Sequence, residues 1–244
     1  MIGTPRVHHR LTDSTNERAK ALAADGAPHG TLVTADEQSA GRGRQGRVWT
    51  APPGSAVLMS LVLRELDERH ALLPLAAAVA VCEAMPVEAS VKWPNDIWIE
   101  RRKVAGILVE ARPQAGWAVL GIGLNVSITH DDFPPELRDT ATSLSLASAP
   151  PGPPATPAAP ATPATPATPA SVLGLLLPAL DHWLGASPVT VLSAWRDRDA
   201  LKGEPIAWSD GSGIADGIDD SGALLVQTRN GPVTLDAGEV HLQR

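Results

Sequence analysis

The sequence has 244 residues and is 43% hydrophobic, which suits one sizeable folded domain and a smaller one. Its formal net charge of −7 argues against a broad basic face for nucleic acid. The chain has no signal-type apolar segment and no run of about 18 apolar residues, so we expect a cytoplasmic protein that does not enter a membrane.

The first part of the chain alternates between helix and strand patterns. In order, we predict a helix over 16–24, strands over 31–37 and 55–64, and an apolar helix over 72–85 that covers the sheet. The stretch Asp13-Ser14-Thr15 supplies N-cap chemistry for the first helix. Cys82 is the only cysteine, so it cannot form an internal disulfide, and no Cys/His cluster has zinc spacing. We expect it to be buried and unreactive.

Between the first two strands lies Gly41-Arg42-Gly43-Arg44-Gln45-Gly46-Arg47, in which glycines separate three arginines and no acid occurs. Glycine lets backbone N–H groups approach an anion, and guanidinium groups bind phosphate or carboxylate. The spelling satisfies the dinucleotide fingerprint G-x-G-x-x-G, but Pro52 and Pro53 bar the helix that this motif must open. Kinase and Walker A motifs are absent. We interpret the segment as an anion-binding loop.

After the apolar helix, a strand over 88–93 is predicted to run into Lys92-Trp93-Pro94-Asn95-Asp96. Pro94 cannot sit in a central ladder, so Asn95 and Asp96 should project from a turn. Two further strands are predicted over 103–112 and 116–127. They contain Gly106, Gly121 and Gly123, and a flat ligand lying on the sheet would explain glycines there.

The composition changes abruptly at 150–170, where nine of the chain's 23 prolines fall within 20 residues of an Ala-Thr-Pro-rich stretch. Such a segment cannot pack a core, so we predict a disordered, polyproline-like spacer. Helices are predicted over 171–184 and near 189–201, with Trp195 as a core anchor. From 204 onward, Asp-Gly and Asn-Gly turns separate short strands, which predicts a small β-barrel or barrel-like module.

Five motifs occur together in the order and spacing of biotin–protein ligases, and the chain resembles that family from about 13 to 144. The motifs are Asp13-Ser14-Thr15-Asn16, Gln38 with 41–47 and Trp49, the stretch 92–96, the stretch 103–110, and 121–125. The terminal module, with Gly238-Glu239-Val240, resembles the family's C-terminal domain. The resemblance implies an α+β fold: a mixed β-sheet backed by helices, as in class II aminoacyl-tRNA synthetases, and a small SH3-like β-barrel.

The implied domains are a catalytic domain over 1–149, the spacer over 150–170, a helical end of the catalytic domain over 171–202 and the SH3-like domain over 203–244. Many members carry an N-terminal winged helix, for which this chain has no room. We therefore expect the short form, without DNA binding, as a monomer or weak homodimer. The implied reaction joins biotin and ATP, with Mg²⁺, into biotinyl-5′-AMP and passes biotin to a lysine of a biotin carboxyl carrier domain.

The resemblance also assigns roles to individual residues. Arg44 and Lys103 would contact the biotin carboxylate and the phosphate, and Asp96 would complete the catalytic set. The expected biotin-binding residues are Ser14, Thr15, Asn16, Gln38, Gly41, Arg42, Gly43, Arg44, Lys103, Gly106 and Leu108. The expected ATP-binding residues are Arg44, Arg47, Trp49, Asn95, Asp96, Lys103 and Asn125, with 142–144 bordering the base.

Several alternatives stay open at this stage. Trp49 could stack on adenine or be a core residue, and Asp96 could help to position Mg²⁺ or activate the acceptor lysine. A lipoate or octanoate ligase of the same fold would use similar chemistry. From another functional class, an arginine loop of this kind also suits a non-enzymatic RNA-binding module.

Overall fold

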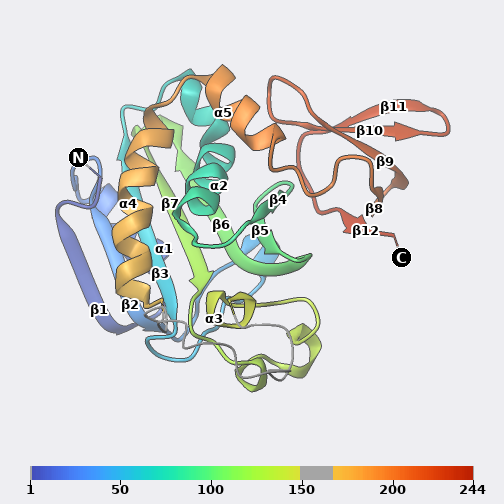
Figure 1. The fold of residues 1–244 in the computed structure, drawn as a ribbon. Helices are drawn as coiled ribbons and strands as arrows, with labels where there is room; N and C mark the ends of the chain where they lie inside the picture. Colours follow the sequence, from blue (N-terminus) through green and yellow to red (C-terminus); the bar gives the residue numbers. More distant parts are fainter. Residues whose placement is uncertain (1, 149–166, 244) are drawn as a thin grey trace.

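The computed structural model describes residues 2–148 and 167–243. Its larger part is a seven-stranded sheet in the order β1-β2-β3-β7-β6-β5-β4 (Figure 1). The strands are β1 Arg6–Thr12, β2 Leu32–Gln38, β3 Ala56–Arg64, β4 Ser90–Lys92, β5 Asp96–Ile99, β6 Arg102–Arg112 and β7 Trp117–Asn125. The β1–β2 pair is parallel and the other pairs are antiparallel, so the sheet is mixed, as predicted.

The helices are α1 Thr15–Ala24, α2 Leu73–Ala84, α3 Leu144–Ala147, α4 Pro169–Gly185 and α5 Pro188–Arg196. Short 3-10 turns cover Arg44–Gly46, Glu68–Leu72, Pro113–Ala115, His130–Asp132 and Pro135–Leu137. Among the described residues, no helix is long and apolar enough to cross a membrane.

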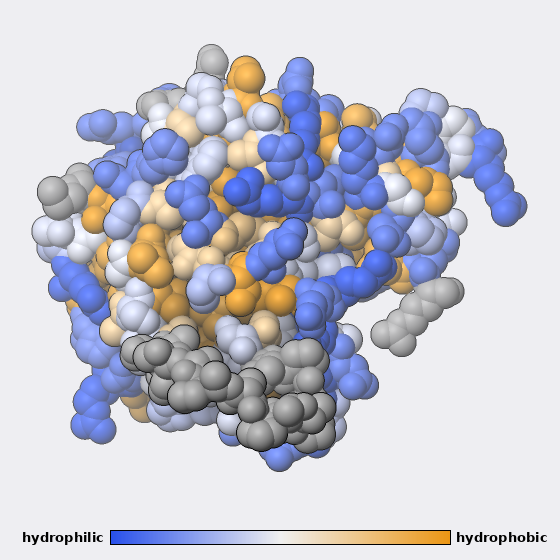
Figure 2. All heavy atoms as spheres, in the orientation of Figure 1, coloured by the Kyte–Doolittle hydropathy of each residue, from blue (hydrophilic) through white to orange (hydrophobic). Residues whose placement is uncertain are grey.

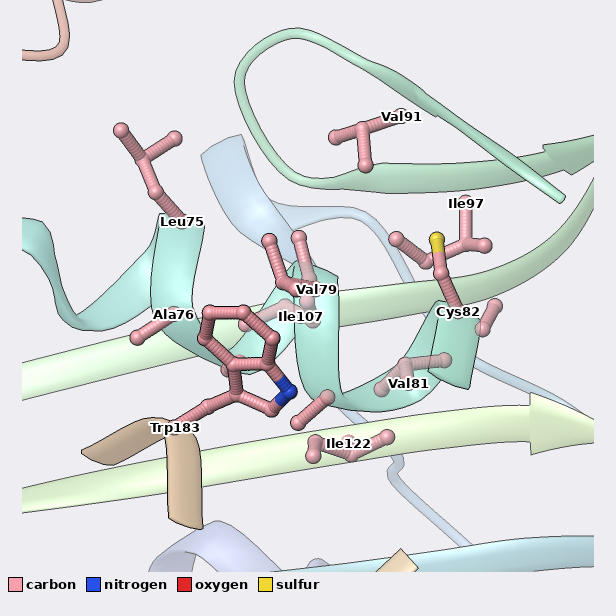
Figure 3. Close-up of a cluster of buried hydrophobic side chains, with 14 of the residues drawn as sticks. Leu75, Ala76, Val79, Val81, Cys82, Val91, Ile97, Ile107, Ile122 and Trp183 are labelled. Carbon is pink, nitrogen blue, oxygen red and sulfur yellow. The ribbon is translucent and has the colours of Figure 1, made fainter. Parts of the chain in front are cut away.

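One face of the sheet is covered by α2 and α4 (Figure 1). Helix α2 is apolar on nearly every side, as expected for a helix buried between a sheet and another helix. Figure 3 shows its side chains between Trp183 of α4 and the strand residues Ile107 and Ile122. The Trp183 indole donates a hydrogen bond of 2.6 Å to Glu83. Cys82 is buried here, and burial raises the pKa of its thiol to about 12.

The opposite face of the sheet is covered differently. Only α1 packs there among the described helices of more than one turn, through Ala19 and Ala23 against Val33, Val62 and Val119. Strand side chains alternate between the two faces, which is why neighbours in one strand can have separate roles. This second face leaves room beside α1 for the site described below.

The C-terminal residues form a separate antiparallel sheet in the order β11-β10-β9-β8-β12. Its strands are β8 Pro205–Trp208, β9 Gly211–Ile218, β10 Leu224–Thr228, β11 Gly231–Leu235 and β12 His241–Leu242. Within the described residues β11 and β12 are edge strands that do not pair, so hydrogen bonds do not close the sheet into the expected barrel. The sheet is anchored on the larger part, where the Trp93 indole donates to the Gly222 carbonyl at 3.0 Å.

Several elements differ from the sequence predictions. Strand β1 was not expected, because its residues are polar and it lies at the sheet edge. Asp96 begins strand β5 instead of projecting from a loop, since the turn is confined to 93–95. Asp216-Gly217 lies inside β9, where the register shifts, so it is a bulge and not a turn.

The segment around the predicted spacer can be compared only in part. Most of 150–170 lies outside the described residues. The helix expected from 171 begins earlier, at Pro169, because Thr168 and Ser171 form a capping box in front of it. Trp195 is fully buried, as predicted. On the face drawn in Figure 2, apolar residues remain visible over α2 and α4, and hydrophilic residues dominate the margins.

Candidate functional site

A cavity of about 890 Å³ opens on the sheet face that α2 and α4 do not cover. Its walls are the start of α1, the arginine loop, strands β6 and β7, and the C-terminal stretch 239–243. Of the individual residues expected from the sequence to bind biotin or ATP, only Gly41 does not line it, and the stretch 142–144 expected to border the base lies just behind the lining. The roles assigned to these residues stay predictions; what the structure establishes is that they share one cavity.

The polar back wall of the cavity starts at α1. Ser14 occupies the N-cap position, yet its side chain makes no capping hydrogen bond, contrary to the expected capping role. The Thr15 backbone N–H donates to Gln38 Oε1 at 2.8 Å, and the Thr15 hydroxyl lies 3.1 Å from the same oxygen. Ser60 on β3, fully buried, lies 2.8 Å from Thr15 Oγ1 and 2.6 Å from Asn16 Oδ1.

This wall continues into a series of charged side chains. The Asn16 amide donates to Glu110 Oε2 at 2.9 Å, and Lys20 donates to the other Glu110 oxygen at 2.9 Å. Lys20 also reaches Glu17 at 2.7 Å, and Glu17 forms an ion pair with Arg42 of the loop. The hydrogen bond from Lys20 is the largest cause that lowers the pKa of Glu17. Arg42 is therefore paired with a carboxylate of α1.

The arginine loop folds as a small hairpin. Arg42 pairs with Val48, and the Gly43 N–H donates to the Arg47 carbonyl at 2.8 Å. At Gly41 an added Cβ would lie 2.2 Å from the Trp49 carbonyl oxygen, so only glycine fits. Gly41 thus closes the base of the hairpin, which explains why it does not line the cavity. No α-helix follows the loop, in agreement with the rejection of a dinucleotide fingerprint.

The loop is held over the cavity by two distant segments. Arg44 donates to Asn95 Oδ1 at 2.9 Å and to the Gly238 carbonyl at 3.4 Å. Arg47 forms an ion pair with Glu239. The C-terminal module therefore contributes to the walls of the cavity.

Cations gather at the end of the cavity opposite the α1 wall. The Lys103 ammonium lies 2.6 Å from Asp96 Oδ1 and 5.6 Å from the centre of the Trp49 ring. Lys92 lies over the Trp98 ring at 5.4 Å. Burial lowers the pKa of Lys92, and the positive charges of Lys103 and Arg47 lower it further, against the opposing effect of the Asp96 and Glu239 carboxylates. This end of the cavity suits an anion, which would relieve the repulsion among the cations.

The strand glycines leave space above the sheet, and side chains of the chain itself occupy it. A Cβ at Gly123 would lie 2.5 Å from Trp49 Cε2, and one at Gly106 would lie 3.1 Å from Trp49 Cζ3. Trp49 is half-buried, and its indole nitrogen is a buried donor without a partner among the described residues. Both properties fit a ring that can rearrange around a flat ligand.

The side of the cavity beyond β7 is more apolar. Leu58, Ile128 and Phe133 pack here, and Trp49 lies against the same cluster. The Asn125 amide donates to the Thr142 carbonyl at 2.9 Å, so it fixes the chain that borders this side. The wall itself is formed by Thr140 and Ala141, directly before the predicted stretch 142–144.

Sequence reasoning assigned no role to several residues that belong to this arrangement. Ser60 sits in an apolar strand, and Glu110 is the end of a motif in which only earlier residues received roles. Glu239 lies 192 residues from its partner Arg47. Glu110 had a signal in the sequence, because it stands in register with Gly106 and Leu108 on one face of β6. Glu239 lies in the stretch 238–240 that resembles the family, and Ser60 had no signal.

The described residues contain no group of three His, Cys, Asp or Glu side chains that could hold a metal ion. Asp96 is a carboxylate at the cationic end of the cavity, with its Oδ1 bound to Lys103. A metal ion here would need most of its ligands from elsewhere.

Comparison with known proteins agrees with this geometry. The model of the biotin/lipoate A/B protein ligase family matches residues 8–127, and that of the biotin protein ligase C-terminal domain matches 210–242. The bifunctional ligase/repressor BirA of Bacillus subtilis is 44% identical over 157 residues, which are 61% of this chain and 48% of that protein. The chain thus spans about half the length of this relative.

Two other relatives match over nearly their whole length. The biotin–[acetyl-CoA-carboxylase] ligase of Paracoccus denitrificans is 35% identical, with 94% of this chain and 97% of that protein covered. The biotin protein ligase of Aquifex aeolicus in complex with biotin and ATP is 27% identical, with a TM-score of 0.80 over 99% of both chains. The sequence, the fold and the residues that line the cavity all agree with these relatives. The chain belongs to the biotin protein ligase family.

Proposed function

We propose that this protein is an ATP-dependent ligase that activates biotin as biotinyl-5′-AMP and transfers it to a lysine of a biotin carboxyl carrier domain. The observation that carries the proposal is the polarity of one cavity. A wall of neutral donors and acceptors lies at α1, and a cluster of cations lies at the other end. Biotin has the same polarity, with a neutral ureido ring at one end and a carboxylate at the other.

The first step would join two anions, and this is where the cations act. A carboxylate oxygen of biotin attacks the α-phosphorus of ATP, and pyrophosphate leaves with the electrons of the broken P–O bond. Arg44 and Lys103 would stabilise the negative charge that gathers on these oxygens, since preorganised cations lower such barriers. Asn95 holds Arg44 at 2.9 Å, and Asp96 holds Lys103 at 2.6 Å.

The second step would pass the acyl group to an amine. The neutral ε-amine of the acceptor lysine attacks the acyl carbon, AMP leaves, and the nitrogen releases a proton. Asp96 is a carboxylate at the cationic end of the cavity, where it would receive that proton. The same residue could instead help to hold Mg²⁺, and the two roles make different demands on its charge.

This site could hold Mg²⁺ only if the ion were bound by both the protein and the phosphate groups of ATP. One carboxylate together with phosphate oxygens is a donor set that Mg²⁺ accepts, and Asp96 would supply the carboxylate. When bound, the ion would neutralise phosphate charge. We further propose that the C-terminal sheet is the family's SH3-like module and that it steadies the loop through Gly238 and Glu239.

The test is biotin-dependent exchange of labelled pyrophosphate into ATP, followed by labelling of a carrier domain and detection of the attached biotin. We expect both reactions with biotin and neither with lipoate or octanoate. Activity with lipoate but not with biotin would replace this function by that of the related acyl ligases. No exchange with any of these acids would overturn it.

A further inference from the structure

The back wall of the cavity contains a continuous series of five polar side chains. In space the order is Glu110, Asn16, Ser60, Thr15 and Gln38, with successive heavy-atom distances of 2.9, 2.6, 2.8 and 3.1 Å. They come from β6, α1, β3 and the end of β2. Ser60, Thr15 and Asn16 are almost completely buried, so solvent cannot rearrange the hydrogen atoms between them.

Counting hydrogen atoms fixes the direction of the bond between Ser60 and Asn16. Ser60 has one hydroxyl hydrogen but contacts both Asn16 Oδ1 and Thr15 Oγ1. The carbonyl oxygen of Asn16 can only accept, so the Ser60 hydrogen must point to it. The single Thr15 hydroxyl hydrogen then goes either to Ser60 or to Gln38, and in both cases Thr15 Oγ1 keeps only lone pairs for the cavity. Gln38 Oε1 competes for the same Thr15 hydrogen at 3.1 Å, but it keeps the Thr15 backbone N–H at 2.8 Å.

This direction depends on which end of the Asn16 amide faces Ser60, and that is decided by Glu110. An ionised carboxylate only accepts hydrogen bonds, so Asn16 must turn its NH₂ group toward Glu110. Burial alone would raise the pKa of Glu110, but hydrogen bonds from Asn16 and Lys20 outweigh it and lower that pKa. Gly121 leaves the space, since a Cβ there would lie 2.0 Å from Asn16 Oδ1.

We propose that Glu110 is a positioning residue that orients this series, so that the wall offers hydrogen-bond acceptors to the N–H groups of the ligand. With the hydrogens directed toward Glu110, Thr15 Oγ1 and Asn16 Oδ1 have only lone pairs left for the cavity. Without Glu110 the Asn16 amide can flip and turn its NH₂ group toward Ser60. Ser60 must then turn its hydrogen to Thr15, and Thr15 donates away from Ser60. The inference rests on the proposed function, because it takes the ureido ring of biotin as the ligand.

The test measures biotin affinity by calorimetry without ATP, using Glu110→Leu and Glu110→Gln. We expect Glu110→Leu to weaken binding by about 10- to 100-fold, as expected for about one to two misdirected buried hydrogen bonds. Glu110→Gln keeps the shape, and its amide oxygen can still accept from Asn16, so it should recover most of the affinity. Thermal unfolding of each variant checks the fold, and the isosteric Gln variant keeps the test open if the Leu variant does not fold.

A biotin analogue with one ureido nitrogen methylated distinguishes a loss of hydrogen-bond orientation in the wall from general damage to the binding site. It lacks one N–H group, so Glu110→Leu should weaken its binding at least threefold less than that of biotin. Two matched controls are Lys20→Met, which removes the ion pair of Glu110 but leaves the bond from Asn16, and the exposed Glu88→Gln. We expect Glu88→Gln to leave biotin affinity unchanged and Lys20→Met to change it by less than about threefold.

The inference and the proposed function can fail separately. Unchanged biotin affinity in both Glu110 variants, or equal losses for biotin and the methylated analogue, would overturn the inference. Wild-type protein that binds biotin with the expected Glu110 dependence but catalyses no pyrophosphate exchange would overturn the proposed function and leave the inference standing. Wild-type protein that does not bind biotin would overturn both.

Discussion

The two faces of the seven-stranded sheet are built from the same strands but serve opposite purposes. Leu61 and Ser60 are neighbours in β3 and both are fully buried. Leu61 joins the apolar core under α2 and α4, whereas Ser60 turns to the other face and forms hydrogen bonds with Thr15 and Asn16. Burial alone therefore does not reveal the role of a strand residue; the face on which it lies does.

The difference extends across neighbouring strands. On the cavity face, the paired rows are Ser60–Gly121–Leu108 and Leu58–Gly123–Gly106, so glycine recurs where the cavity meets the sheet. On the other face the same strands carry Ile107 and Ile122, which pack against α2 (Figure 3). The apolar face stabilises the fold, and the glycine-containing face gives up packing to leave room for a ligand. Substitutions on the two faces should separate these contributions.

The largest effect should come from the apolar face. Leu61→Ala removes a fully buried side chain and should lower the free energy of unfolding by about 2–5 kcal/mol. Denaturant unfolding measures this loss. Biotin affinity of the folded fraction should stay near that of wild type, because the side chain points away from the cavity. A selective loss of biotin affinity without a loss of stability would contradict the division between the faces.

Lys103→Ala tests the cavity face. It should slow biotin-dependent pyrophosphate exchange by about 10²–10³-fold, as for removal of one preorganised donor at a developing charge. Its matched control is Arg112→Ala, an exposed cation at the other end of the same strand, which should leave exchange unchanged. If Lys103→Ala unfolds while its folded fraction keeps full activity, Lys103 is a structural residue.

Gly123→Ala tests the need for space on the sheet. Its Cβ would lie 2.5 Å from the Trp49 ring, so the indole must move. We expect the KM for ATP in pyrophosphate exchange to rise by about tenfold, which corresponds to about 1.4 kcal/mol. The KM for biotin should change less, because the α1 wall is not touched. Equal changes in both constants would mean that Trp49 does not separate the two subsites.

Low pH should reduce the contribution of the cavity face to the stability of the fold. The pKa values of Glu17 and Glu110 are both lowered in the folded protein, so their contribution to stability is present above about 4.5, the usual value. It is lost as the pH falls below 4.5 through their folded values. Glu110→Gln should therefore lose less stability than wild type between pH 6 and pH 3, measured by denaturant unfolding. An identical pH profile for the variant would exclude this linkage.

The smallest effect is expected at Gly174, where the missing side chain leaves no space that another group uses. Gly174 lies in the middle of α4 and is exposed, with no heavy atom within 4 Å of an added Cβ. Gly174→Ala should stabilise the protein by about 0.5–1 kcal/mol, because it favours the helix. Thermal unfolding should show a higher Tm with unchanged exchange activity. A lower Tm would indicate that α4 has a contact at this position in solution.

Local patterns predicted much of the fold. The apolar run of α2, the strands β2, β3, β6 and β7 and the Asp-Gly and Asn-Gly turns at 210–211 and 230–231 were all expected. The errors have local causes. Strand β1 is polar because it lies at an edge, and the Asp-Gly pair at 216–217 is a bulge because β9 continues through it in pairing with β10.

The sequence by itself indicated most of the residues that line the cavity, because its motifs are short segments whose chemistry and spacing can be read along the chain. Only the tertiary structure decided how these residues act on one another. Glu110 reaches Asn16 across 94 positions, and Arg47 reaches Glu239 across 192. Such contacts depend on which strands pair and which face each side chain takes, and sheet topology and register set both of these through long-range packing.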